Sequence, residues 1–576
     1  MQDKIYRVNL EDLTAKIEDV PDNLMYLGGR GITSAITADE VELMCHPLGK
    51  KNKLIFAPGL LSGTSAANTG RLSAGAKSPL TKAIKESNSG GTAAQLFAKT
   101  GVKALVVEGI PQDKNTWYGI RVSPGNIEIE KTDLKGKGNF EVIETLTKDN
   151  PKVGVITIGS AGEMKMSAAN LSVKDPGGKI RSLGRGGLGA VMGSKNIKYI
   201  VIDPKDSKSV YVKDPEKFKE AAKKFAKTLT DHPVSGEGLP TYGTNILTNV
   251  LHEAGGLPTN NFSSGQFEGH EAISGEKMNE LIEKRGGKVK HGCHAGCVIQ
   301  CSQVYNDKDG NYVTSGFEYE TIWANGANCG IDDIDALAYA DHLMDDIGID
   351  TIETGAAVAV AMEAGVLEFG DAKGLVNIIE NEIAKGTPLG RIIGAGAETT
   401  GRVFGVTRVP VVKGQAMPAY DPRAVKGMGV TYATSTMGAD HTAGYCVTSN
   451  ILNVGGASDP LKKDGQVELS RNLQIATASL DTAGLCIFTA FAILDNDKAM
   501  EAIVDMLNAR FGTALSADDI MDIGASVLKT EREFNQKAGF TEKDDRLPEF
   551  FADEKFPPHD TVWDFTDQEI DEFWNF

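Results

Sequence analysis

The first third of the chain alternates short apolar runs with glycine-rich turns. This pattern is typical of β-strands joined by tight connections. The runs that predict strands are KALVVEGI (103–110), NIEIEK (126–131), VGVITIGS (153–160) and IKYIVID (197–203). We therefore predict a β-rich N-terminal region.

After residue 206 the apolar positions change to a helical period. Asp214-Pro215 supplies an N-cap and a first-turn proline, which together predict the start of a helix. The apolar positions that follow at helical spacing are Phe218, Ala221, Ala222, Phe225, Ala226 and Leu229. The segments 332–348 and 374–386 show the same period, so helices dominate the rest of the chain.

These patterns predict an α+β fold. A chain of 576 residues is too long for one core at about 150 residues per domain. We predict a β-rich N-terminal domain (1–206) that binds the cofactor inferred below, followed by two mainly helical domains (207–410 and 411–576). The second boundary is placed at RVPVVKG (408–414).

Composition narrows the setting. The longest apolar run, 355–362, is too short to span a bilayer, and the N-terminus has no apolar signal segment. Seven cysteines, a low and odd number, favour a reducing cytoplasm over a disulfide framework. The net charge of −18 argues against nucleic acid as a partner. We expect a cytoplasmic protein with neither a membrane nor a nucleic-acid partner.

Three cysteines lie within nine residues, in HGCHAGCVIQC (291–301). Such a cluster favours a metal site over buried structural thiols. Gly292 and Gly296 make an irregular loop at least as compatible as a helix. Zinc could take His291 or His294 as a fourth ligand, whereas an iron–sulfur cluster requires a remote cysteine. The remote candidates are Cys45, Cys329, Cys446 and Cys486. The spacing alone does not choose between the two metals.

Glycine-rich stretches predict anion-binding loops. GRGGLG (184–189) formally matches the dinucleotide fingerprint, but we expect no strand in 174–183 before it, so we set that reading aside. The loop can instead present Arg185 and backbone N–H groups to an anion. The other glycine-rich stretches are NTGR (68–71), SNSGG (87–91) and GGRG (28–31), the last of which could be merely a turn. Several such loops indicate a large cofactor with more than one phosphate.

Two distant segments, DDIGID (345–350) and DTAGLC (481–486), share the pattern D-x-x-G-[LI]-[CD]. The other ordered motifs are NTGRLSAGAKSPLT (68–81), ESNSGG (86–91), RGGLGAVMGSK (185–195), FEYETIWANGANCG (317–330) and GADH (438–441). Together they resemble the tungsten- or molybdenum-containing aldehyde ferredoxin oxidoreductases, from about residue 4 to the C-terminal region.

The resemblance implies a [4Fe–4S] cluster with Cys293, Cys297, Cys301 and Cys486 as ligands. Here the three clustered cysteines are spaced C-x3-C-x3-C, whereas the best-known members have C-x2-C-x3-C. This difference in spacing bears most on the assignment of Cys293 as a cluster ligand.

The resemblance also implies tungsten or molybdenum held by two molybdopterins. The matching phosphate-side residues are Arg71, Asn88, Gly90, Arg185 and Gly186. Backbone carbonyls of Asn88 and Gly186 would hold Mg²⁺. The residues that match the pterin-contacting positions are Asp345, Ile349, Asp350, Asp481, Leu485 and Cys486.

The catalytic residues implied by the resemblance are Glu320, as a base, and His441, as a hydrogen-bond donor to the carbonyl oxygen. Considered alone, Glu320 could be one of several surface carboxylates, and His441 a core histidine beside Asp440. The residues themselves do not favour Glu320 over Glu318.

Two further departures indicate a distinct branch. The segment Tyr339-Ala340-Asp341-His342 replaces the E-x-x-H pair through which some family dimers share a metal, so a homodimer would lack a bridging metal. Met437 stands where better-known members often have a basic residue.

Three functions follow as hypotheses. The first is oxidation of an aldehyde to a carboxylic acid, with electrons passed to ferredoxin or a ferredoxin-like subunit. The second is the catalytic subunit of a related low-potential reductase of the aromatic acyl-CoA type. The third is a non-enzymatic iron–sulfur electron-transfer subunit.

Overall fold

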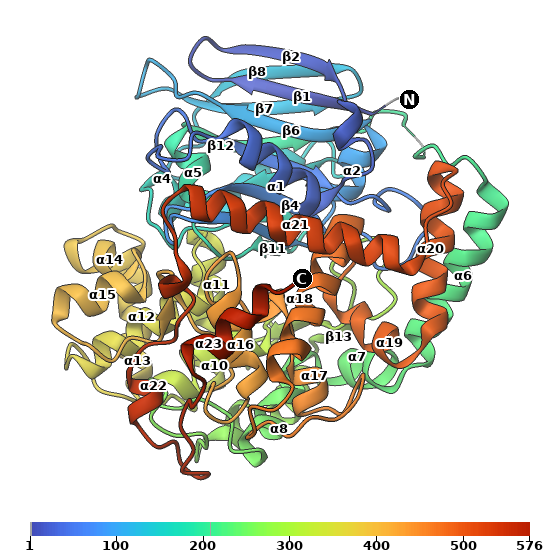
Figure 1. Cartoon of the computed structure of the whole chain (residues 1–576). Coiled ribbons are helices and arrows are strands. Elements are labelled where there is room, and N and C mark those ends of the chain that lie inside the picture. The colour runs from blue at the N-terminus through green and yellow to red at the C-terminus, as the bar shows by residue number, and fades with distance from the viewer. Residues whose placement is uncertain (1–2, 208) are drawn as a thin grey trace.

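The computed structural model describes residues 3–207 and 209–576. The strands of the N-terminal part form one end of the molecule, and helices from the rest of the chain fill the other end (Figure 1). This arrangement confirms the predicted α+β class.

Two six-stranded sheets build the N-terminal part. In the first sheet the spatial order is β2 (Thr14–Asp19), β1 (Lys4–Asn9), β6 (Val102–Glu108), β3 (Leu54–Pro58), β4 (Leu72–Lys77) and β5 (Ile84–Ser89). In the second sheet it is β11 (Ile180–Leu183), β10 (Leu171–Lys174), β9 (Gly154–Thr157), β12 (Ile197–Ile202), β7 (Trp117–Ser123) and β8 (Asn126–Thr132). Most neighbours are antiparallel; β1 with β6 and β7 with β12 are parallel.

The side chains of the first sheet alternate between two cores. Phe56 and Val107 belong to a core shared with the second sheet, so the two sheets pack face to face. Ile55 and Val106, one residue earlier in each strand, pack on the opposite face against Ile32 of helix α1 (Gly29–Glu40). This period of two is the pattern expected of strands buried on both faces.

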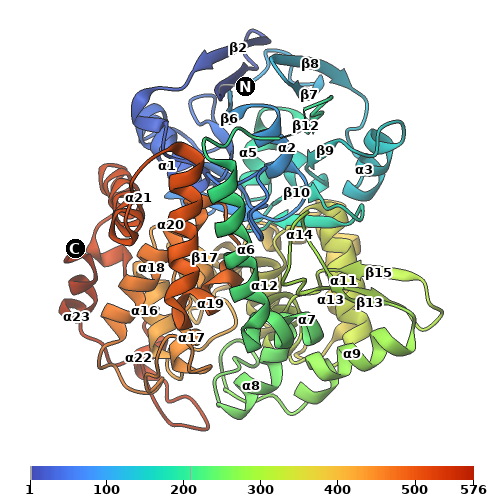
Figure 2. The same cartoon turned by 90° about the vertical axis from the view of Figure 1, so that its right-hand side faces the viewer.

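The helical part contains most of the remaining elements (Figure 2). Its longer helices are α6 (Pro215–Asp231), α9 (Gly275–Lys284), α11 (Ile334–Ile347), α12 (Thr351–Glu363), α15 (Ala397–Phe404), α16 (Lys426–Thr434), α18 (Gln466–Ala483), α20 (Asp497–Phe511) and α21 (Ala517–Lys537). A short three-stranded sheet, β13 (Lys288–His291), β14 (Ser302–Asn306) and β15 (Tyr312–Ser315), lies among them. None of the helices in the described part of the chain is long and apolar enough to cross a membrane.

The helix predicted at Asp214-Pro215 is confirmed. Asp214 accepts a hydrogen bond from the backbone N–H of Lys217, and Pro215 is the first helical residue. Phe218 and Phe225 are buried against α20. The predicted segment 374–386 is helical but begins earlier and includes a π-helical turn, as α13 (Ala372–Asn377) and η6 (Ile378–Ile383).

One expectation is wrong. Residues 174–183 do contain strand, because β10 and β11 form an antiparallel hairpin around the turn 175–179. A strand therefore precedes the glycine loop 184–189, and the short helix α5 (Leu188–Ser194) follows it. The dinucleotide reading still fails, since β11 is an edge strand separated from β12 by two others and no parallel β-α-β unit forms.

The two predicted helical domains share one hydrophobic core. Trp323 from the first packs in the same cluster as Tyr420 and Phe551 from the second. The boundary near residue 410 therefore remains a prediction, whereas the change from strands to helices falls between β12, which ends at Ile202, and α6.

Candidate active site

A cavity of about 590 Å³ lies between the N-terminal strands and both helical halves. The site residues expected from the sequence that line it are Arg71, Gly90, Arg185, Cys293, Cys301, Glu320, Asp345, Asp350, His441 and Cys486. The other expected residues, which do not line it, are Asn88, Gly186, Cys297, Ile349, Asp481 and Leu485. Most of the expected residues therefore meet in one place, although they come from distant parts of the chain.

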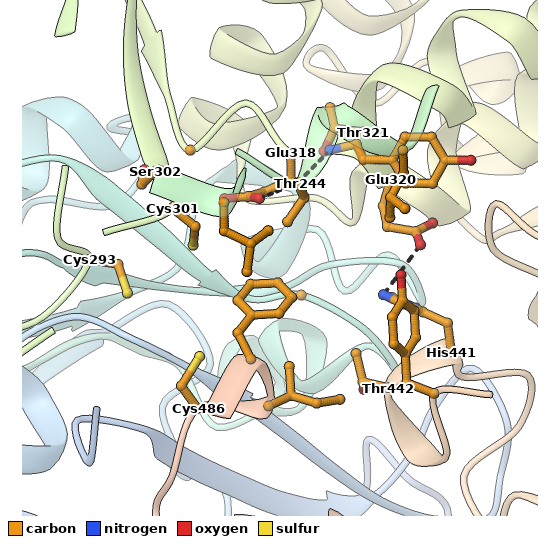
Figure 3. Close-up of a pocket in the computed structure, with 18 of the residues that line it drawn as sticks. Thr244, Cys293, Cys301, Ser302, Glu318, Glu320, Thr321, His441, Thr442 and Cys486 are labelled. Carbon is orange, nitrogen blue, oxygen red and sulfur yellow. Dashed lines mark hydrogen bonds and ion pairs between the residues drawn. The ribbon is translucent and has the colours of Figure 1, made fainter. Parts of the chain in front are cut away.

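The three clustered cysteines lie on an irregular loop between β13 and β14, not on a helix. Gly296 (φ 83°) and Gln300 (φ 52°) adopt left-handed conformations in this loop. Figure 3 shows the thiols of Cys293, Cys301 and Cys486 turned toward a common space. All seven cysteines lie within the described residues and are free thiols.

Asn68 holds the two cysteine-bearing segments together. Its backbone carbonyl accepts a hydrogen bond from the N–H of Cys486 at 2.9 Å. Its side chain accepts from the Val298 N–H at 3.0 Å and donates to the Cys297 Sγ at 3.7 Å. A single buried residue of the N-terminal part thus fixes the remote cysteine beside the cysteine loop.

The remote cysteine candidates differ in position. Cys486 lines the cavity together with Cys293 and Cys301. Cys45, Cys329 and Cys446 are buried in other apolar clusters. The geometry therefore singles out Cys486.

The two histidines beside the cysteines also differ. His291 is paired with another residue, with its Nε2 2.7 Å from Asp175 Oδ2, and is not in the group of ligand atoms around Cys293. His294 lies with Cys293 and Cys297 in one group whose ligand atoms are within 4.8 Å of one another. His294 is therefore the histidine that zinc could use.

Four thiols fit an iron–sulfur cluster in the chemistry of their donors. Burial raises the pKa of Cys486 to about 11, while nearby Arg71 opposes that rise. Burial also raises the pKa of Cys301, with the Glu318 carboxylate adding to the effect. Metal ligation stabilises thiolates, so a bound cluster would offset this cost of burial.

The paired D-x-x-G motifs adopt the same local structure. Each glycine, Gly348 (φ 71°) and Gly484 (φ 82°), ends a helix in the left-handed conformation. Asp345 and Asp481 lie in the last turns of these helices. An acidic side chain is unfavourable at that end of a helix dipole, so helix capping explains the glycines but not the aspartates.

Asp481 belongs to a buried charge network behind the cavity. Arg30 donates to both oxygens of Glu531, at 2.9 and 2.8 Å, and lies 3.4 Å from Asp481. Burial and the neighbouring Asp481 raise the pKa of Glu86 to about 8. The GGRG stretch (28–31) thus opens α1 and presents Arg30 to carboxylates of the protein.

Arg71 belongs to a second polar chain at the cavity wall. Its guanidinium donates to the side-chain and backbone oxygens of Asn88, at 2.7 and 2.9 Å. Asn88 in turn donates to Asp481 at 3.2 Å. Two of the five guanidinium N–H donors of Arg71 have these protein partners.

Arg185 is bound more completely by the protein. It lies 3.1 Å from Asp350 and 3.2 Å from Glu353. It also donates to the backbone carbonyls of Ala416 and Ala439, at 2.8 and 2.9 Å. Arg185 therefore ties the glycine loop to both helical halves.

The two carbonyls expected at a magnesium site already accept hydrogen bonds. Ser78 donates to the Gly186 carbonyl at 2.7 Å, and Arg71 donates to that of Asn88. Each carbonyl oxygen retains a second lone pair.

Glu320 and His441 point toward each other and are in contact at the cavity wall (Figure 3). Glu320 lies in the first turn of α10 (Tyr319–Asn325) and His441 in the 3-10 helix η7 (His441–Ala443). The Nε2 of His441 is 3.4 Å from Glu320 Oε1. The Glu320 and His441 side chains are 13% and 15% exposed, respectively. Neither residue is a surface group.

Burial raises the pKa of Glu320, while His441 and the Ala419 N–H, which donates to Oε2 at 3.1 Å, oppose the rise. Glu320 Oε1 and His441 Nδ1 are buried without hydrogen-bond partners. A carboxyl and an imidazole held in this way can exchange a proton with a molecule in the cavity.

Two further cavity residues were not selected from the sequence. Glu318 lines the same cavity and accepts a hydrogen bond from Thr244 at 2.6 Å, and burial raises its pKa. Arg181 also lines it and pairs with the buried Asp175 at 3.0 Å. The proximity of Arg181 to the glycine loop was the available signal; nothing in the sequence distinguished Glu318.

The fold and the cavity are those of a redox metalloenzyme. The family description "aldehyde ferredoxin oxidoreductase, N-terminal domain" matches residues 5–204, and "aldehyde ferredoxin oxidoreductase, domains 2 & 3" matches residues 220–576. The chain belongs to the aldehyde ferredoxin oxidoreductase family. The hypothesis of a non-enzymatic electron-transfer subunit is therefore wrong.

Similar proteins cover almost the whole chain. A tungsten-containing aldehyde ferredoxin oxidoreductase of Thermococcus kodakarensis is 37% identical, over 96% of this chain and 92% of that protein. One of Pyrococcus furiosus is 36% identical with the same coverage. The WOR-like subunit of an aliphatic sulfonate oxidoreductase of Pyrococcus furiosus is 28% identical, over 73% of this chain and 71% of that protein.

A solved structure has the same fold. It is the active-site complex BamBC of benzoyl coenzyme A reductase with 1,5-dienoyl-CoA, at a TM-score of 0.81 and 18% identity. The match covers 99% of this chain and 93% of that chain. At this identity the likeness describes the fold alone.

Proposed function

We propose that the protein oxidises an aldehyde to a carboxylic acid at a tungsten or molybdenum centre held by two molybdopterins. Electrons leave through a [4Fe–4S] cluster to ferredoxin or a ferredoxin-like subunit. The observation that carries the proposal is the Glu320–His441 pair, which faces the same cavity as Cys293, Cys301 and Cys486. The relatives named tungsten-containing aldehyde ferredoxin oxidoreductases support it.

The reaction adds water to the aldehyde and releases protons and two electrons. The metal centre, when bound, accepts the electron pair. His441 lines the cavity, and its Nε2, 3.4 Å from Glu320 Oε1, would donate a hydrogen bond to the carbonyl oxygen. The Glu320 carboxylate removes a proton from water or from the hydrated carbonyl, because its Oε1 has no other hydrogen-bond partner.

The cofactor would be held by residues of all three parts of the chain. Arg71 keeps guanidinium donors for a phosphate, while Gly90 provides close backbone approach beside Cys293. Asp345, Asp350 and Asp481 would orient the pterin rings through charge-assisted hydrogen bonds. Ile349 and Leu485 would frame those rings. Mg²⁺ would use the second lone pairs of the Asn88 and Gly186 carbonyls.

Two further expectations belong to this proposal. A cytoplasmic location fits the free cysteines. A homodimer without a bridging metal fits the segment 339–342, because Asp341 accepts a hydrogen bond from Thr314 and the His342 ring N–H donates to the Val313 carbonyl within the same chain.

The test is anaerobic purification, metal analysis and assay with aliphatic and aromatic aldehydes and a low-potential electron acceptor. We expect one tungsten or molybdenum per chain and reduction of the acceptor. A fully metallated protein that is inactive with every aldehyde but reduces an aromatic acyl-CoA would replace the proposal with the second hypothesis. We retain the second hypothesis because the chain shares its fold with the benzoyl coenzyme A reductase complex.

A further inference from the structure

A buried lysine lies behind the Glu320–His441 pair. Lys85, on β5, is 1% exposed, and its Nζ is 3.0 Å from Asp440 Oδ2. A buried ammonium is costly unless it is paired. Asp440 is its one ion-pair partner among the described residues.

The glycine loop is shaped around the lysine side chain. A Cβ at Gly186 would lie 2.5 Å from Lys85 Cγ and 2.7 Å from both Cδ and Cε. The lysine stem therefore crosses directly beside Gly186, and only a residue without a side chain fits there. Since Lys85 does not line the cavity, its effect on a bound molecule must pass through Asp440.

Asp440 connects the lysine to His441. Its side chain accepts from the N–H of Thr442 at 3.1 Å and from the Thr442 hydroxyl at 2.8 Å, which caps the turn that carries His441. Asp440 Oδ1 is 4.0 Å from His441 Nδ1. Although burial would raise the pKa of Asp440, Lys85 and His441 hold it well below the usual range, so the carboxyl stays ionised.

We propose that Lys85 is a positioning residue that fixes the Asp440 carboxylate and, through it, the orientation and charge of the His441 imidazole. The proposal rests on the function proposed above for His441. Lys85 immediately precedes the ESNSGG segment (86–91). Because Lys85 lies on β5, the N-terminal sheet as well as the two helical halves would help to position the Glu320–His441 pair.

Other charged or titratable groups also lie near His441. Glu320 lies opposite on α10, and Tyr420 and Tyr445 have ring centroids 6.2 and 6.3 Å from the imidazole. Arg185 donates to the carbonyl of Ala439. Because Arg185 and the bonds from Thr442 remain, removal of the Lys85 charge leaves an ionised Asp440 less compensated, which favours protonation of the imidazole.

The test uses Lys85→Met and Lys85→Arg in the anaerobically purified holoenzyme. Deuterium exchange at the imidazole carbon, followed by mass spectrometry over a pH series, titrates each of the nine histidines separately. We expect the His441 midpoint to rise by about 1 pH unit in Lys85→Met, the size expected for a changed charge balance a few ångströms away. Lys85→Arg should restore it.

The kinetic expectation is a fall in kcat of about tenfold with little change in KM, because the imidazole acts mainly in the transition state. The acid limb of the pH profile should move with the His441 midpoint. Lys77→Met is the matched control, since Lys77 is a buried lysine on the neighbouring strand β4 whose ammonium donates to the Leu43 carbonyl. It should change neither measurement.

A His441 midpoint that is unchanged or falls in Lys85→Met overturns the proposal. If this variant does not fold, Lys85→Gln replaces it under the same criteria. The titration needs no substrate, so failure of the aldehyde assay and failure of this proposal are separate results.

Discussion

His441 Nε2 lies 3.4 Å from Glu320 Oε1, although His441 begins the 3-10 helix η7 in the C-terminal half and Glu320 lies in the first turn of α10 in the middle of the chain. Neither side chain lies among the cysteine thiols, so neither is placed to ligate a metal held there. Their separation from the thiols allows function to be tested without loss of metal (Figure 3).

Glu320→Gln should therefore retain full metal and lose most activity. The amide keeps the volume and can still accept from the Ala419 N–H but cannot act as a base, and loss of a general base costs about 10²–10⁴-fold in rate. The loss should fall on kcat. Steady-state kinetics with metal analysis of the same preparation measures it.

Glu318, two residues away, is not a neutral control, because it lines the same cavity. Glu40→Gln is suitable: Glu40 is a partly buried glutamate on α1, 2.8 Å from Arg7, and lies outside the cavity. Wild-type turnover by metallated Glu320→Gln would exclude Glu320 as the base.

Cys297→Ala and Cys486→Ala should each abolish the reduced [4Fe–4S] signal in electron paramagnetic resonance and electron transfer to an external acceptor. Asn68 donates to the Cys297 Sγ and accepts from the backbone N–H of Cys486, which brings the two segments together. Cys446→Ala, a buried thiol near Thr431, should leave the signal unchanged. An intact four-iron signal in Cys486→Ala would contradict the ligand set.

Substitution of Arg185 and substitution of Arg71 should have different effects. Arg185→Met leaves Asp350 and Glu353 without their partner, and breaking a buried pair costs about 3–5 kcal/mol. Burial already raises the pKa of Glu353 to about 7 with the arginine present. We expect a lower unfolding temperature even without cofactor, measured by calorimetry.

Arg71→Met should instead lower cofactor retention. Arg71 pairs mainly with the neutral Asn88, and a charge-assisted hydrogen bond to a phosphate contributes about 1.5–3 kcal/mol. Metal content after gel filtration measures this loss, with the unfolding temperature of the metal-free protein as the companion measurement. Full metal content in Arg71→Met would show that Arg71 does not hold the cofactor.

Stability should fall toward alkaline pH because of Glu86. Its pKa is raised from the ordinary value of 4.5 to about 8 in the folded protein, so the folded state holds a proton that the unfolded state releases. The resulting stabilisation is complete below about pH 4.5 and disappears as pH rises to about 8. Glu86→Gln should flatten this part of the stability curve, measured by chemical denaturation at several pH values. A curve parallel to the wild type would show that Glu86 does not contribute.

Local patterns predicted much of the fold. Short apolar runs bounded by turns identify strands such as β6, and the spacing of Phe218 and Phe225 identifies α6, because both reflect contacts with a nearby core. The strands β10 and β11 were missed because Pro176, Gly177 and Gly178 dominate a hairpin whose strands have only four residues each.

The site was less accessible to such reasoning. Arg185 and Glu353 are far apart in the chain, and no periodic pattern in the sequence predicts that they pair. Glu318 and Glu320 both line the cavity. Glu318 stands at the N-cap position of α10 and Glu320 in its first turn, so their two-residue spacing alone does not show which side chain reaches the cavity. The resemblance to a family supplied what periodicity could not.

The position of Cys486 has a consequence for biosynthesis. The residue that fixes it, Asn68, lies far upstream in the sequence and leaves the ribosome well before Cys486. A nascent chain that has not reached residue 486 contains the three clustered cysteines but not the fourth. A cluster that needs all four thiols can therefore be completed only after residue 486 has been synthesised and its segment has met Asn68.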